Sequence, residues 1–283
     1  MAGLGLVLEG GAMRGMFTAG VTDVYMEQGI DFDGAVGVSA GAAFGCNVKS
    51  RQIGRVIRYN KRFCRDWRFA GIRSWLLTGD LYGADFDYRR LPAELDPWDT
   101  ETFRKNPMAF WCVCTDADTG EPVYWRCSDG GEKDLLYIRA SASMPVASRP
   151  VEVDGRRLLD GGIADSIPLR FFEEQGYARN VVILTQPADY RKEPLSHAAL
   201  LHRFLLQYPA VEKRLLHRHI DYNRETAYAR MEEALGKALV ICPDAPLGIG
   251  SVCHDPDELE RVYQIGRKKG EETAARVKRF LES

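Results

Sequence analysis

Short runs of apolar residues alternate along the chain with longer stretches in which apolar side chains recur at helical spacing. Uninterrupted runs of this kind suit strands that are buried on both faces, as in a parallel sheet covered by helices. We therefore predict strands over residues 4–8, 35–38, 110–115, 123–126 and 181–185, a hairpin around Asp154-Gly155, and a last strand over 239–242. This alternation predicts a three-layer α/β fold, in which a mixed and mostly parallel central sheet lies between two layers of helices.

The first two predicted strands each end in a glycine-containing turn that leads into a predicted helix, over residues 16–26 and from residue 40 onward. A serine flanked by glycines, as in Gly37-Val38-Ser39-Ala40-Gly41, suits a sharp strand-to-helix turn that lifts the hydroxyl out of the sheet. Free backbone N–H groups at the start of the first helix suit a negative charge. We therefore predict that Ser39 is a nucleophile, that Gly37 and Gly41 flank its elbow, and that the oxyanion hole draws on Gly10, Gly11, Ala12, Met13, Arg14, Gly15 and Ala40.

Two other interpretations of these turns are weaker. Ordinary tight turns without chemistry would use similar residues. A dinucleotide-binding turn would need Gly-x-Gly-x-x-Gly and an acidic residue about 20 positions later. Asp31 or Asp33 could be that acidic residue, but the glycines of the first turn are spaced differently, and the next strand runs into Ser39. The spacing therefore favours a serine hydrolase over nucleotide binding.

A serine nucleophile needs a base, and the five histidines all lie in the last third of the chain. Asp160 ends the second arm of the predicted hairpin, and Gly161 and Gly162 after it leave room for a neighbouring segment. A carboxylate on rigid backbone can serve as the base of a Ser–Asp dyad. The order serine, acid, histidine leaves His254 open as an alternative base, although such an elbow normally follows several strands. The remaining histidines suit surface positions in a charged helical stretch: His197, His202, His217 and His219.

Together these segments resemble the patatin-like phospholipases, in which a Gly-Gly-Gly-x-Arg-Gly loop, a Gly-x-Ser-x-Gly elbow and an Asp-Gly-Gly or Asp-Gly-Ala segment occur in this order. The resemblance covers residues 4–190 and includes the segment Ala140-Ser-Ala-Ser-Met-Pro145. It implies a lipid acyl hydrolase of phospholipase A or esterase type with a patatin-like fold. It also implies that Ser39 forms the acyl-enzyme, that Asp160 is its base, and that Gly11 and Ala12 donate to the oxyanion, with Arg14 as the basic residue of the loop.

Position 12 departs from the pattern of that family, because Ala12 stands where a third glycine is usual. Alanine keeps its N–H, so the oxyanion hole can survive. If this position requires a positive φ, however, the loop is strained by about 1–2 kcal/mol. An acyltransferase that uses the same serine, or a catalytically idle lipid-binding protein, would keep the same motifs.

The amino-acid composition limits the kinds of partner and cofactor that we expect this chain to bind. The 283 residues include 38 basic and 40 acidic side chains, a balance that argues against nucleic acid as the principal partner. Seven cysteines favour reduced thiols in a cytoplasmic protein over a disulfide framework. No basic leader precedes the first predicted strand, and the longest uncharged stretch, residues 34–48, is shorter than the about 20 residues of a membrane span. We expect no cofactor and no metal, since the Cys112, Cys114 and Cys127 thiols suit packing better than zinc binding.

We expect a catalytic domain over residues 1–195 and a mostly helical C-terminal extension over 196–283, packed on the core, with helices over 200–216, 221–235 and 256–281. Residues 67–82 are aromatic and apolar without clean periodicity. They could wall a fatty-acyl channel or make a peripheral membrane contact, whereas core packing or a dimer contact is the simpler interpretation. The sequence leaves the oligomeric state open, and it implies a lipid or a small ester as substrate.

Overall fold

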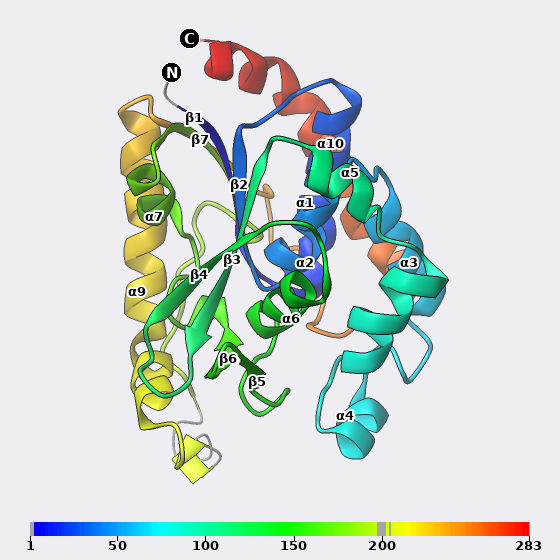
Figure 1. Cartoon of the computed structure of the whole chain (residues 1–283). Helices are drawn as coiled ribbons and strands as arrows, with labels where there is room; N and C mark the ends of the chain where they lie inside the picture. The colour runs from blue at the N-terminus through cyan, green and yellow to red at the C-terminus, as the bar shows by residue number, and fades with distance from the viewer. Residues whose placement is uncertain (1–2, 197–201, 204, 283) are drawn as a thin grey trace.

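In the computed structural model, which describes residues 3–196, 202–203 and 205–282, one central sheet organises the chain (Figure 1). Its strands are β1 (Gly3–Leu8), β2 (Gly34–Val38), β3 (Ala109–Asp116), β4 (Pro122–Cys127), β5 (Val151–Val153), β6 (Arg156–Asp160), β7 (Tyr177–Ile183) and β8 (Ala238–Ile241). The order is β5-β6-β3-β2-β1-β7-β8, and β4 also pairs with β3. The strands β1, β2, β3, β7 and β8 run parallel, whereas β4 and β6 run antiparallel to β3. The predicted mixed, mostly parallel sheet is confirmed.

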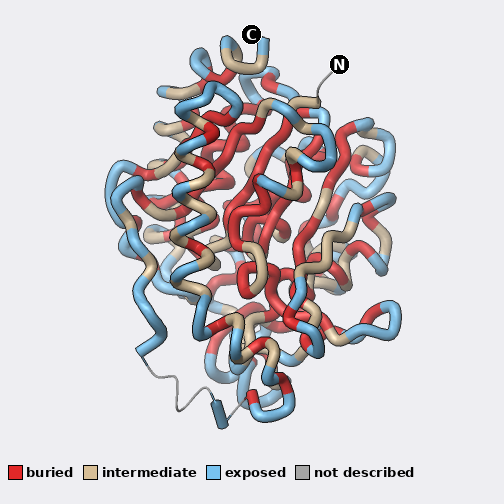
Figure 2. The backbone as a smooth tube through the Cα atoms, turned by 90° about the vertical axis from the view of Figure 1, so that its left-hand side faces the viewer, coloured by how far each residue is buried: buried red, intermediate tan, exposed pale blue. Residues whose placement is uncertain are grey.

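Helices cover both faces of the sheet (Figure 1), and the strands between them are mostly buried (Figure 2). On one face lie α7 (Leu169–Glu174) and α9 (Pro209–Ala234). The other face carries α1 (Gly15–Glu27), α2 (Ala40–Lys49), α3 (Arg55–Phe63), α6 (Glu132–Ser141) and α10 (Pro256–Glu282). Shorter elements are α4 (Ile72–Thr78), the π-helix η2 (Phe86–Leu95), α5 (Thr100–Lys105), and the 3₁₀ turns η1 (Ala12–Arg14) and η3 (Gly161–Ile163).

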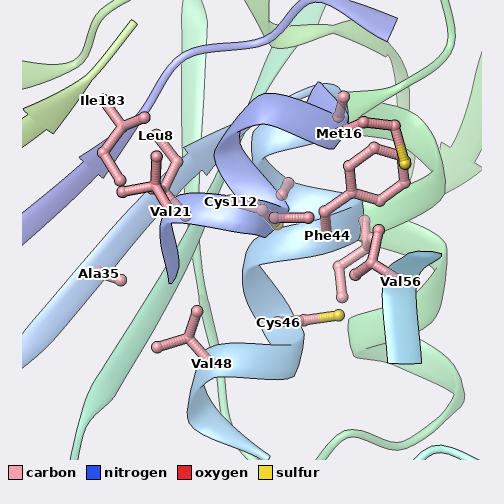
Figure 3. Packing of buried hydrophobic residues seen from close by; sticks show 14 of the residues in the cluster. Leu8, Met16, Val21, Ala35, Phe44, Cys46, Val48, Val56, Cys112 and Ile183 are labelled. Carbon is pink, nitrogen blue, oxygen red and sulfur yellow. The ribbon is translucent and has the colours of Figure 1, made fainter. Parts of the chain in front are cut away.

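Neighbouring residues of β1 pack on opposite sides of the sheet, because side chains alternate along a strand. Leu8 belongs to the cluster beneath α1 and α2, whereas Val7 belongs to the cluster beneath α7 and α9. Figure 3 shows the first of these clusters, in which Leu8 and Ile183 of the strands lie with Val21 of α1 and Phe44 of α2. This burial on both sides is the reason that the strands appear in the sequence as uninterrupted apolar runs.

Most predicted strands agree with the structure to within a residue at each end, and two larger differences stand out. The strand predicted over 181–185 is β7, which begins at Tyr177 because its polar first residues pair with the start of β1 near the end of the sheet. The predicted break between helices at 217–220 is wrong, since α9 is continuous from Pro209 to Ala234. Neither glycine nor proline interrupts its interior, and Pro209 stands in the first turn, where a missing N–H costs nothing. Positions 200, 201 and 204 of the predicted helix over 200–216 lie outside the described residues.

The C-terminal part of the chain completes the same core. As predicted, the last strand returns to the edge of the sheet, where β8 pairs with β7, and α10 packs along α1. The cysteines in the described ranges form no disulfide. Within those ranges no helix combines the length and the apolar character that crossing a bilayer would require. The domain boundary at residue 195 and the cytoplasmic location stay predictions.

Candidate active site

The carboxyl ends of β2 and β6 meet at one edge of β3. β4 pairs with β3 along one edge of β3. β2 and β6 therefore both pair with β3 along its opposite edge, one after the other. β2 ends with Val38 opposite Val113, and β6 ends with Asp160 opposite the next residue, Cys114. Because β2 runs parallel to β3 and β6 runs antiparallel to it, the two strands point their last residues at the same place. This register brings Ser39, the residue after β2, together with Asp160.

Ser39 occupies a strained turn between β2 and α2. Its φ of 55° and ψ of −121° are rarely adopted by residues with a side chain. Its N–H donates to Oγ of the buried Ser141, at the end of α6, over 2.9 Å. A Cβ at Gly37 would lie 2.3 Å from the carbonyl oxygen of Gly41, and a Cβ at Gly41 would lie 2.3 Å from that of Leu8. Both glycines are therefore needed for the close packing of this elbow, and Ser141 anchors it.

Asp160 is buried, with 2% of the residue exposed. Its Oδ1 accepts a hydrogen bond from the Gly162 N–H at 2.8 Å, whereas its Oδ2 is buried and has no partner among the described residues. Burial raises the pKa of Asp160, and the Ser39 hydroxyl, the Arg218 guanidinium and the Gly162 N–H act against that rise. The Ser39 hydroxyl thus lies beside the carboxyl but makes no hydrogen bond of normal geometry to Oδ2. Such a bond can form when substrate binds, because catalytic hydrogen bonds are often long in the absence of substrate. Oδ2 is free to accept a proton.

The turn after β1 lies against the elbow, since a Cβ at Gly10 would be 2.8 Å from Cβ of Ser39. Ala12 has a φ of 49°, the left-handed conformation in which alanine is strained. The N–H groups of Arg14 and Gly15 already bond within η1, so these two residues have no N–H left for an oxyanion. In this turn and at the first residue of α2, the N–H groups of Gly10, Gly11, Ala12, Met13 and Ala40 have no acceptor among the described residues.

Two cavities meet at Ser39. The larger, of about 400 Å³, is lined mostly by apolar and aromatic side chains of α2, α3, η2 and the segment after α6. The smaller, of about 160 Å³, contains Asp160 and is lined mostly by polar groups. Ala12, Ser39, Met144 and Ser251 line both. The serine hydroxyl therefore stands at the boundary between an apolar and a polar chamber.

Residues 67–82 divide between cavity wall and surface. Phe69, Leu81 and Tyr82 line the larger cavity, and Phe69 is also core. In α4, by contrast, Leu76 and Leu77 are 71% and 64% exposed. The expectation of plain core packing therefore fails for α4, because its apolar side chains point away from the protein.

The described histidines lie outside this site. His254 is exposed, and its Nδ1 contacts the carbonyl oxygen of Cys64. None of the histidines in the described ranges lines either cavity, and His197 lies outside those ranges. No group of three His, Cys, Asp or Glu side chains in the described part of the chain is arranged to hold a metal ion. The independence from metal stays a prediction.

Sequence reasoning missed several residues that line the polar cavity or support it. Ser141 lies in the Ala140–Pro145 segment and could have been suspected from its place there. Lys192, Arg218 and Tyr222 follow no motif, and Arg218 and Tyr222 belong to the charged helix α9, whose sequence resembles that of any surface helix. Arg218 donates from Nε to the carbonyl oxygen of Gly162, and so supports the segment that follows Asp160.

Comparison with known proteins decides the family. The model of the family described as patatin-like phospholipase matches residues 6–172, which include the loop, the elbow and the Asp160 segment. The chain belongs to the patatin-like phospholipase family. A second model, for a domain of unknown function (DUF6363), matches residues 208–282.

Relatives of this patatin-like protein differ in length. An uncharacterized Escherichia coli protein, YjjU, is 30% identical over 98% of this chain and 79% of its own. The lysophospholipase NTE1 of Saccharomyces cerevisiae is 29% identical over 71% of this chain, but the match spans only 12% of the yeast protein. Among solved structures, VipD from Legionella pneumophila aligns with a TM-score of 0.49 and 14% identity, over 97% of this chain and 67% of VipD.

Proposed function

We propose that this protein is a serine lipid acyl hydrolase, which cleaves a carboxylic ester bond of a lipid with Ser39 as nucleophile and Asp160 as base. The proposal rests on what surrounds Ser39. The serine occupies a strained elbow, and this elbow lies beside a buried carboxylate oxygen without a partner and beside a loop whose N–H groups have no acceptor. Membership of the patatin-like phospholipase family and the lysophospholipase relatives support lipid esters as the substrate class.

In this reaction Ser39 Oγ attacks the ester carbonyl carbon while its proton passes to Oδ2 of Asp160. An ordinary aspartate is a weak base at neutral pH, and the raised pKa of Asp160 makes it a better one. The charge that develops on the carbonyl oxygen is stabilised by the free N–H groups of the turn after β1. The proton then passes to the departing alcohol oxygen, and an acyl ester remains on Ser39. Water activated by Asp160 attacks this ester, and the fatty acid leaves as Ser39 is regenerated.

The fatty-acyl chain would occupy the larger cavity. Its volume of about 400 Å³ lies in the range of about 300–1,000 Å³ that is usual for small-molecule sites. Phe44, Tyr59, Leu91 and Ile138 are among the side chains that line it, and Ser39 lines both this cavity and the polar one. An acyl chain in this cavity would place its ester carbon beside the serine hydroxyl.

The proposal is tested by mass spectrometry of the products formed from a lysophospholipid by the wild-type protein and by Ser39→Ala. Free fatty acid is expected from the first and not from the second, and a fluorophosphonate probe should label Ser39. Transfer of the acyl group to an added alcohol in preference to water would favour the acyltransferase. If the probe leaves Ser39 unlabelled and no lipid is consumed, the protein binds lipid without chemistry, and the proposal is wrong.

Activity is expected to persist within about twofold after treatment with EDTA. Calcium-dependent lipases use the ion to hold the oxyanion, whereas here backbone N–H groups are available for that task. Ester hydrolysis before and after chelation and dialysis is the measurement. If EDTA abolishes turnover and calcium or zinc restores it, the turn after β1 does not hold the oxyanion as proposed.

We also propose that α4 touches the lipid surface from which the substrate is drawn. Its exposed apolar side chains include Ile72, which is 72% exposed. The helix adjoins the walls of the larger cavity, because Trp75 Nε1 donates to the carbonyl oxygen of Val146 and the Leu81 N–H donates to that of Ala147. Leu81 and Ala147 both line that cavity. Figure 1 shows α4 projecting from the end of the molecule opposite the N-terminus. An apolar surface continuous with an acyl cavity suits a membrane.

Replacing both Leu76 and Leu77 by serine is expected to weaken binding to phosphatidylglycerol-containing vesicles by at least about tenfold, since burying each leucine contributes about 1.5–3 kcal/mol at most. Vesicle sedimentation measures this binding. The matched control is Leu235→Ser, because Leu235 is 61% exposed just after the far end of α9. Hydrolysis of a dissolved short-chain ester should be unchanged. Equal vesicle binding by the double variant and the control would exclude α4 as the contact.

A further inference from the structure

The polar cavity beside Ser39 holds more positive charge than catalysis by the dyad requires. Arg14, Lys192 and Arg218 all line it. Within the described residues none of the three forms an ion pair, and Arg14 Nε is buried without a hydrogen-bond partner. The Lys192 Nζ faces the ring of Tyr222 at 5.0 Å from its centroid, and that amine has no hydrogen bond in the described part of the chain.

The one other buried acid in the lining, Glu9, does not neutralise these cations directly. Its two carboxylate oxygens accept hydrogen bonds from the Thr185 N–H, the Thr185 hydroxyl and, at 2.7 Å, the Tyr222 hydroxyl. Burial, together with the Arg218 and Arg14 charges, lowers the pKa of Lys192 to about 8, against an opposite effect of Glu9. The cations therefore repel one another in a partly desolvated space, which an anion would relieve.

We propose that Arg14, Lys192 and Arg218 form a subsite for the phosphate group of a lysophospholipid whose ester lies at Ser39. Guanidinium groups suit phosphate oxygens because their N–H donors can bond in pairs, and a lysine ammonium adds a point charge. Ser39 lines both cavities, so one substrate can place its acyl chain in the apolar cavity and its phosphate in the polar one. This assignment rests on the proposed function and names its substrate class.

The C-terminal part of the chain contributes to this cavity. Arg218 and Tyr222 lie on α9, and Lys192 is held by its backbone, whose N–H donates to Asn223 Oδ1 at 2.9 Å and whose carbonyl accepts from Asn223 Nδ2 at 3.0 Å. Thus α9 supplies Arg218 and holds Lys192 in place, and both cations lie outside residues 6–172, the range that matches the family model. The specificity for an anionic head group would be a property of this added part.

The test uses binding, so that it does not depend on hydrolysis. 1-O-Dodecylglycerol 3-phosphate and 1-O-dodecylglycerol carry the same chain on an ether oxygen, which no esterase cleaves, and they differ only in the phosphate. Calorimetric titration of the wild-type protein is expected to show at least about tenfold tighter binding of the phosphate lipid, as expected for a charged hydrogen bond in a desolvated site. Lys192→Gln should remove most of that difference. The control Lys213→Gln changes an exposed lysine of α9 outside both cavities and should preserve the difference.

Three results would overturn the subsite. The two ether lipids could bind the wild-type protein equally well, or the folded Lys192→Gln variant could keep the full preference. Inorganic phosphate alone could bind as tightly as the phosphate lipid and lose that affinity in Lys192→Gln, which would make this a site for free phosphate. A protein that shows the preference but releases no fatty acid from lysophospholipids would refute the proposed hydrolase and leave the phosphate site standing.

Discussion

Ser39→Ala and Asp160→Asn are each expected to lower kcat for ester hydrolysis at least about a thousandfold, and the double variant is expected to be little worse than either. Groups that act on one proton transfer lose their effect together, so their single losses do not add. Ser39→Ala keeps a Cβ at the strained φ of 55°, and asparagine can still accept the Gly162 N–H. The Asp160→Asn variant loses only the proton acceptor at Oδ2. Initial rates with a p-nitrophenyl ester and a lysophospholipid measure the effect.

The control for this experiment is His254→Ala, which should be within about twofold of wild type because His254 is exposed and lines neither cavity. Circular dichroism confirms that each variant is folded. A dead but folded His254→Ala would replace the dyad by a triad. Losses in the two single variants that multiply in the double variant would show that Ser39 and Asp160 act independently.

Ala12→Pro is expected to lower turnover at least about a hundredfold, whereas Ala12→Gly should keep activity or exceed wild type. Proline removes the N–H and cannot adopt the φ of 49°, so it changes both the donor and the loop. Glycine keeps the donor and relieves about 1–2 kcal/mol of backbone strain, which should raise the free energy of unfolding. KM should change less than kcat, because this hydrogen bond strengthens as charge develops on the carbonyl oxygen.

Ala12→Ser is the matched variant here, because it keeps both the N–H and a side chain at positive φ. It should stay within a few-fold of wild-type turnover. Near-normal turnover in a folded Ala12→Pro protein would show that other groups hold the oxyanion. Gly10, Gly11, Met13 and Ala40 are among the N–H donors near Ser39 that have no acceptor in the described structure. Chemical denaturation of the glycine variant tests the strain separately from the chemistry.

The sequence was a sound guide wherever the backbone imposes a local requirement. An elbow with Ser39 at positive φ needs small residues at positions 37 and 41, and a β-hairpin turn favours Asp154-Gly155, so these patterns are visible without a structure. Strands buried on both faces must be apolar throughout, and the strand predictions were therefore close. The fold class follows from the same two kinds of signal.

The sequence was a poor guide wherever a residue acts through a distant partner. The polar beginning of β7 carries no apolar signal, because it pairs at the end of the sheet. The apolar residues of α4 have the composition of core residues, and only their place at the surface shows that the protein leaves them uncovered. Likewise Arg218 looks like one more charge on a long helix until α9 is seen to pass the segment after Asp160.

By itself, then, the sequence determined the order of strands along the chain, the two glycine turns and the identity of Ser39 and Asp160 as candidate partners, because these depend on allowed φ and ψ values and on side-chain periodicity. Only the tertiary structure decided that β2 and β6 end against neighbouring residues of β3, that Ala12 adopts a positive φ, and that three cations share a cavity with the serine. Strand register and helix packing bring together segments far apart in the chain, and such contacts leave no pattern in the local sequence of either partner.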